Sequence, residues 1–95
     1  MSHDALIDRL SGSVETTATG TVIYRNTAGK LHRIGGPAII YATGEEHWNQ
    51  NGKLHRIDGP AVVHPNGLRV WYLNGVPMLE DEHSRRIASG VYHDV

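Results

Sequence analysis

A phrase of ten residues occurs twice in this chain, and no other feature constrains the fold as strongly. GKLHRIGGPA begins at Gly29 and GKLHRIDGPA begins at Gly52, and the two copies differ only at Gly35 against Asp58. The displacement between them is 23 residues. A fixed period of this length is typical of proteins in which copies of one supersecondary unit stack side by side.

The agreement extends to both sides of the phrase. Nine of the thirteen residues at 29–41 recur at 52–64, and Trp48 recurs as Trp71. Two series of glycines follow the same displacement: Gly29, Gly52 and Gly75 in one, and Gly44, Gly67 and Gly90 in the other. The copies at the two ends depart from the consensus, as terminal capping repeats do.

Each unit is expected to form strand, turn, strand and turn. Asn and Gly reach positive φ at low cost, so Asn-Gly pairs favour the tight primed turns of β-hairpins. The pairs stand at 51–52, 66–67 and 74–75. Short runs rich in β-branched and aromatic residues lie between the turns, at 38–41, 61–64 and 68–73. The sequence predicts a mostly β fold, an antiparallel meander of 23-residue β-hairpin repeats in a single twisted sheet.

The two ends of the single domain, residues 1–95, are expected to differ from the repeats at 19–75. Residues 1–18 are predicted to hold a short N-terminal helical cap. Ala5, Leu6 and Leu10 recur at helical spacing, and Gly12 would end the helix. Residues 76–95 are predicted to form a divergent C-terminal cap with a helical turn or two around 77–88.

Composition excludes several classes of protein. The chain has 95 residues and a formal net charge of −1, without the basic surface that nucleic acids or anionic membranes attract. It has no cysteine, which excludes disulfides and thiolate zinc sites. No signal-peptide pattern and no apolar stretch of about 18 residues occurs, so we expect a cytoplasmic protein without a membrane partner.

The phrase carries a resemblance to a known family of repeats. The residues that match in the second copy are Trp48, Asn51, Gly52, His55, Arg56, Gly59, Pro60 and Ala61. Together they resemble the MORN-like β-hairpin repeats of the YwqK antitoxin-like type, found in small phage and viral proteins. The resemblance covers about 19–75. It implies an extended sheet used for protein contact, without enzyme activity, in a phage- or mobile-element-encoded protein that acts in the host cytoplasm.

The repeated histidines, His32 and His55, allow two interpretations. Seven histidines is a high count for this length, and neutral imidazole is a good zinc ligand or general base. However, equivalent side chains of successive hairpins lie two strands apart, about 9–10 Å, whereas metal ligands must converge within about 2.1 Å of one ion. We therefore expect the histidines to stack on one face, with Arg33 and Arg56 bound to nearby carbonyls or carboxylates, and no metal or cofactor site.

Other residue types give no catalytic constellation. Glu45 and Glu46 are adjacent on a predicted strand, so their side chains point to opposite faces. The carboxylates at 80–82 fall in the predicted cap and are expected to be solvated. No glycine-rich phosphate loop and no glycine-framed nucleophilic serine occurs. We expect a protein that is not an enzyme and has no catalytic residues.

Aromatic residues at the repeat spacing are the candidate partner-binding site. Strand alternation places Leu68, Val70 and Tyr72 on one face and Trp71 on the other, so both faces carry apolar side chains. One period relates Trp48 to Trp71. The candidate binding residues are Tyr24, Trp48 and Trp71, flanked by Arg25, Arg56 and Arg69. Aromatic residues and arginine are enriched in interface hot spots. The alternative is that the tryptophans form the core of the sheet.

The sequence therefore predicts a non-enzymatic protein-binding module that blocks a partner protein, such as an antitoxin or an inhibitor of a host-defence enzyme. A structural or assembly protein that forms a homo-oligomer through its sheet is the second interpretation. A binder of a small ligand or metal is the third.

Overall fold

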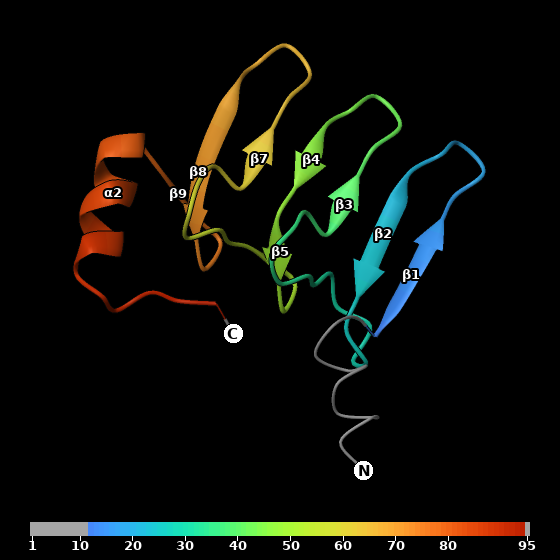
Figure 1. Cartoon of the computed structure of the whole chain (residues 1–95), viewed down its shortest axis with the longest axis horizontal. Helices are drawn as coiled ribbons and strands as arrows, with labels where there is room; N and C mark the ends of the chain where they lie inside the picture. Colours follow the sequence, from blue (N-terminus) through green and yellow to red (C-terminus); the bar gives the residue numbers. More distant parts are fainter. Residues whose placement is uncertain (1–11, 95) are drawn as a thin grey trace.

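The computed structural model describes residues 12–94, which form an antiparallel β-sheet with one C-terminal helix (Figure 1). Seven strands are hydrogen-bonded in the order β1-β2-β3-β4-β7-β8-β9, and β5 pairs with β6 in a separate two-stranded sheet. The elements are β1 Ser13–Thr16, β2 Val22–Arg25, β3 Ile39–Ile40, β4 Glu46–His47, β5 Asn49–Gln50, β6 Lys53–Leu54, β7 Val62–Val63, β8 Arg69–Leu73, β9 Val76–Met78 and α2 Glu80–Ala88.

The prediction of a mostly β, antiparallel fold is confirmed, and so is a C-terminal helix. The single sheet that we expected is accompanied by the separate β5–β6 pair. The predicted N-terminal helix lies outside the described residues. The described end of the segment 1–18 contains strand β1, and the C-terminal segment 76–95 begins with strand β9 before the helix.

Three hairpin turns at one end of the sheet share the same backbone hydrogen bonds and point the same way (Figure 1). Each is closed by two bonds, as in the third, where the His64 N–H donates to Leu68 O and the Gly67 N–H donates to His64 O. Gly67 has positive φ, whereas Asn66 does not. The Asn66–Gly67 pair is therefore the end of a longer turn, and the two-residue primed turn predicted there is wrong.

The opposite end of the sheet carries the tight turns that the sequence predicts. Asn51 has φ 51° and Gly52 has φ 84°, and Asn74 and Gly75 have φ 51° and 83°. Positive φ at both central residues defines a type I′ turn, the hairpin turn that Asn-Gly favours. The prediction of tight primed turns at these two pairs is confirmed.

The sheet is a single layer with a small core. The molecule measures 39 × 34 × 15 Å, and its short dimension leaves little room for a second sheet, which would lie about 10 Å from the first. Within residues 12–94 the buried apolar side chains are Ala38, Ile39, Ala61, Val62 and Leu73. With so few buried side chains, contacts between neighbouring units must supply much of the stability.

Helix α2 and the tail that follows it fold back on the sheet. Acidic residues in the first turn of α2 and basic residues in its last turn complement the helix dipole. The buried His83 donates from Nε2 to the Arg56 carbonyl at 2.6 Å, which fixes α2 to the loop before β7. The tail then returns toward β5 (Figure 1), where Asp94 accepts a hydrogen bond from Gln50 at 2.8 Å.

Candidate functional site

The repeated histidines connect each unit to the turn of the next. His32 Nδ1 accepts the Asn51 backbone N–H at 3.0 Å, and His55 Nδ1 accepts the Asn74 backbone N–H at 2.9 Å. On its other side, the His55 ring donates from Nε2 to the His93 carbonyl at 3.1 Å. Both rings are buried. These bonds support the structural interpretation of the histidines, although the rings bind turn amides and do not stack on one another as expected.

The first repeated arginine, Arg33, lies over an aromatic ring of its own unit. Its Cζ is 4.0 Å from the centroid of the Tyr24 ring, within the range of a cation–π contact. Its Nη1 donates to the Pro37 carbonyl at 3.2 Å. A Cβ at Gly36 would lie 2.7 Å from Arg33 Cζ, so the phrase needs glycine at this position to leave room for the guanidinium.

The second repeated arginine, Arg56, makes the same contacts one period later. Its Cζ is 3.7 Å from the Trp48 ring centroid, and its Nη1 donates to the Pro60 carbonyl at 3.1 Å. A Cβ at Gly59 would lie 2.9 Å from Arg56 Cζ. Arg56 Nε also donates to Asp58 Oδ1 at 2.9 Å. The single difference between the two copies of the phrase therefore supplies a carboxylate for Arg56.

The sheet register places the predicted aromatic residues on one face. Val22, Glu46 and Arg69 fall in one row across the sheet. Tyr24, Trp48 and Trp71 each lie two residues further along the same strands or their extensions, so they share the face of that row. We call these three residues the aromatic row.

The three flanking arginines predicted from the sequence do not all lie on the same face of the sheet as the aromatic row. Arg56 covers Trp48, and Arg69 shares its face and is exposed. Arg25 follows Tyr24 on the strand and so points to the opposite face, where it pairs with Glu15 at 3.1 Å. Arg33, which the sequence did not place among the candidate binding residues, is the residue that covers Tyr24. The recurrence of an aromatic residue before each His-Arg pair was the available signal.

Trp71, at the third position of the row, has a different environment. The residue one period after Arg56 is Leu79, which is 81% exposed. Within residues 12–94 no arginine lies over Trp71. Its half-buried ring instead lines a hollow of about 390 Å³ between the loop after β6 and α2. Ile57 and Ile87 add apolar walls to this cavity, which we call the Trp71 hollow.

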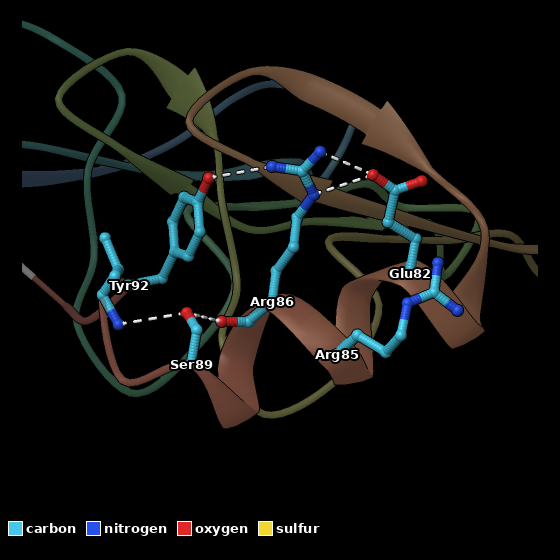
Figure 2. A pocket seen from close by; sticks show the side chains of 6 residues that line it. Glu82, Arg85, Arg86, Ser89 and Tyr92 are labelled. Carbon is cyan, nitrogen blue, oxygen red and sulfur yellow. Dashed lines mark hydrogen bonds and ion pairs between the residues drawn. The ribbon is translucent and has the colours of Figure 1, made fainter.

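A second hollow, of about 460 Å³, lies beside the C-terminal end of α2 (Figure 2). Arg86 dominates it and is bound on both sides. Its Nε and Nη2 donate to Glu82 at 2.8 and 2.6 Å, and its Nη1 donates to the Tyr92 hydroxyl at 3.3 Å. The hydrogen bond with Glu82 raises the pKa of Arg86 further above its ordinary value. Because this charge is neutralised internally, the hollow is a weak candidate for anion binding.

Two histidines converge on one carboxylate at the other end of the sheet. Glu45 accepts from His47 Nε2 at 2.6 Å and from His64 Nδ1 at 3.0 Å. The hydrogen bond from His47 is the largest of the effects that lower the pKa of Glu45. His47 also packs edge-on against the Tyr41 ring. In the part of the chain that the structure describes, no three histidine or acidic side chains are placed to hold a metal ion.

Comparison with protein families, with curated proteins and with solved structures finds no match to this chain. The described residues include no helix long and apolar enough to span a membrane. The candidate site therefore rests on the geometry of the aromatic row alone.

Proposed function

We propose that this protein is a non-enzymatic protein-binding module whose partner docks at the open end of the aromatic row. The observation that carries the proposal is the difference between the row positions. Tyr24 and Trp48 lie beneath Arg33 and Arg56, whereas Trp71 has no arginine over it within residues 12–94 and lines a hollow of about 390 Å³, against about 80 Å³ for the hollow that Trp48 lines. A half-buried tryptophan beside a concave surface is the residue type and setting of interface hot spots.

One exposed apolar side chain lies next to this site in the chain. Leu79 is 81% exposed and directly precedes α2, which forms one wall of the Trp71 hollow. Leu68, Val76 and Val91 are also more than half exposed but do not line this hollow.

The resemblance to MORN-like hairpin repeats of the YwqK type completes the proposal. The recurrence of the histidine bonds, the arginine stacking and the turn bonds at one period supports a 23-residue hairpin unit. On this basis the protein is a phage- or mobile-element-encoded blocker of a partner protein in the host cytoplasm, such as an antitoxin or a host-defence inhibitor. We propose that the 23-residue hairpin repeats run over 19–75 and are followed by a divergent C-terminal cap.

Self-association is the second candidate function, because of the sheet edge. All four residues of β1 are exposed, and Val14 on this strand is 51% exposed. Within the described residues β1 pairs only with β2. An open edge with an exposed apolar side chain is a surface on which a second copy could pair.

The test compares capture of a partner by the intact chain and by two variants. The tagged protein and its Trp71→Ala and Val14→Ala variants are incubated with host lysate, and light scattering measures the mass of each. We expect Trp71→Ala to lose the captured protein while Val14→Ala retains it. A closed homo-oligomer of the wild type that captures nothing, and that Val14→Ala dissociates, would instead establish self-association.

A further inference from the structure

The two closed positions of the aromatic row are filled by the same chemical group. At Tyr24 and at Trp48 the Cζ of a guanidinium lies over the ring, 4.0 and 3.7 Å from its centroid. In both units the guanidinium also donates to a proline carbonyl, at 3.2 Å from Arg33 and 3.1 Å from Arg56. The fold therefore builds a slot for one guanidinium beside Tyr24 and another beside Trp48.

The third unit retains the aromatic ring but lacks its arginine. Leu79 stands where the repeat would place the arginine, and its side chain is exposed to solvent. Helix α2 replaces the loop that carries the glycine and proline in the other units. The space beside Trp71 is consequently a hollow of about 390 Å³ that no side chain of residues 12–94 fills.

One carboxylate without an ion pair in residues 12–94, that of Glu80, makes the Trp71 hollow favourable for a cation, whereas the charge of Asp58 is already paired with Arg56. Asp58 and Glu80 both line it, and Glu80 forms no ion pair with any other residue in 12–94. Asp58 uses one oxygen to bind Arg56, and a carboxylate can accept several hydrogen bonds. His83 also lines the hollow, with Nε2 donating to the Arg56 carbonyl. No lysine or arginine lines the hollow.

We propose that the Trp71 hollow receives an arginine side chain of the partner protein, which lies over the Trp71 ring as Arg56 lies over Trp48. The carboxylates of Asp58 and Glu80 would bind this guanidinium in place of a proline carbonyl. Arginine fits better than lysine, because its planar fork stacks on a ring and donates to a carboxylate at the same time. This inference rests on the proposed function and specifies the chemistry of the partner.

The test uses the two tryptophans as separate reporters in one protein. The full chain is labelled with ¹⁵N, and the two indole N–H signals are assigned from Trp48→Phe and Trp71→Phe. N-acetyl-arginine amide is titrated in, with N-acetyl-citrulline amide as the uncharged probe of the same shape. We expect a saturable shift of the Trp71 signal by the arginine probe, with a dissociation constant on the order of 10 mM for one stacked and ion-paired contact. The Trp48 signal should stay in place, because Arg56 already occupies its slot.

Two variants separate loss of the slot from loss of the fold. Trp71→Leu lacks the Trp71 indole, so binding to it is followed by the backbone amide signal of Gly59, which lines the hollow. The arginine probe should shift this amide in the wild type and leave it in place in Trp71→Leu. Glu80→Gln changes an exposed and unpaired side chain, so it should leave the fold intact and weaken binding by roughly threefold. An unchanged affinity in Glu80→Gln, or equal shifts with the citrulline probe, would overturn the inference.

Failure of this inference can be told apart from failure of the proposed function. Suppose that Trp71→Ala loses a partner that the wild type captures, while the arginine probe leaves the Trp71 signal unmoved. The protein-binding function is then supported, and the proposal that an arginine occupies the hollow is refuted. If the Trp71 signal shifts with protein concentration in the absence of any probe, copies of the chain associate near Trp71, and the proposal of a separate partner protein at this site is contradicted.

Discussion

Three residue types of the repeated phrase make contacts that either join one unit to the next or cover an aromatic ring. Glycine at Gly52 forms the turn, and its amide bonds to Leu31 of the preceding unit at 2.8 Å. His32 binds the adjacent turn amide of Asn51. Arg33 then lies over the ring of its own unit. Each of these three positions has a geometric requirement, which explains why glycine, histidine and arginine recur there.

Replacing Gly52 with valine should lower the free energy of unfolding by about 1 kcal/mol or more. The residue has φ 84°, and a β-branched side chain is strained at positive φ. Thr43→Val, in an exposed turn without positive φ at that residue, is the matched control. Urea unfolding measures both. Equal stability of Gly52→Val and the wild type would show that this turn does not require positive φ.

Replacing Gly59 with alanine should displace Arg56 from Trp48. A Cβ at this position would lie 2.9 Å from Arg56 Cζ, so the guanidinium must move. We expect a loss of roughly 1 kcal/mol in stability, the size of a cation–π contact together with a hydrogen bond. In an Arg56→Ala background the same change should cost much less. A double-mutant cycle measures the difference, and additive losses would mean that the glycine has another role.

At the scale of elements, one unit is joined to the next by a hydrogen bond that a histidine ring can accept only when its acceptor nitrogen is unprotonated. The unit that contains β2 is fixed to the β5–β6 turn by His32 Nδ1, which must be unprotonated to accept the Asn51 N–H. Burial lowers the pKa of His32 below its ordinary value of 6.5. Between the lowered value and 6.5 the unfolded chain binds more protons than the folded one, so stability falls as pH decreases through this window.

The matched variant for this pH dependence is His32→Asn. Asparagine keeps an acceptor for the Asn51 amide but does not titrate. We expect the melting temperature of the wild type to fall more steeply below pH 6.5 than that of His32→Asn. Both proteins should lose further stability at lower pH. The pKa of Glu45 is lowered in the folded protein, so its hydrogen bonds stabilise the fold only while the carboxyl group is ionised. If the melting temperatures of the wild type and His32→Asn fall in parallel between pH 6.5 and the pH at which Glu45 is protonated, the role given to His32 is contradicted.

The sequence predicts some elements far better than others. The type I′ turns at Asn51–Gly52 and Asn74–Gly75 follow from local chemistry, because few other residue pairs adopt positive φ twice. The separate β5–β6 sheet was not predicted, since which strands pair depends on the path of the whole chain. Nor was the contact of His83 with the Arg56 carbonyl, because the histidine of α2 lies outside the repeated pattern.

The candidate site was predicted in part for the same reason. Periodicity alone placed Tyr24, Trp48 and Trp71 in one row. It did not reveal that Arg33 and Arg56 close the first two positions, because stacking within a unit depends on how the loop between β6 and β7 and its counterpart fold. Once that stacking is known, the absence of an arginine at position 79 distinguishes Trp71 from the others.

The whole molecule is a thin row of units with a different element at its end. Its 15 Å short dimension leaves no deep core, and helix α2 ends the row with a hollow in place of a third stacked arginine. The central claim is that two similar tryptophans on one face have different roles. We propose that Trp48 is part of the fold and that Trp71 is the open position at which a partner docks.

Unfolding of Trp48→Ala and Trp71→Ala under identical conditions tests this claim most directly. Trp48→Ala removes the ring that Arg56 covers and should cost about 2 kcal/mol or more. Trp71→Ala enlarges an existing hollow and should cost less than half as much, with an unchanged β-sheet circular dichroism spectrum. Equal losses in the two variants, or a larger loss for Trp71→Ala, would show that Trp71 belongs to the core and would contradict the account.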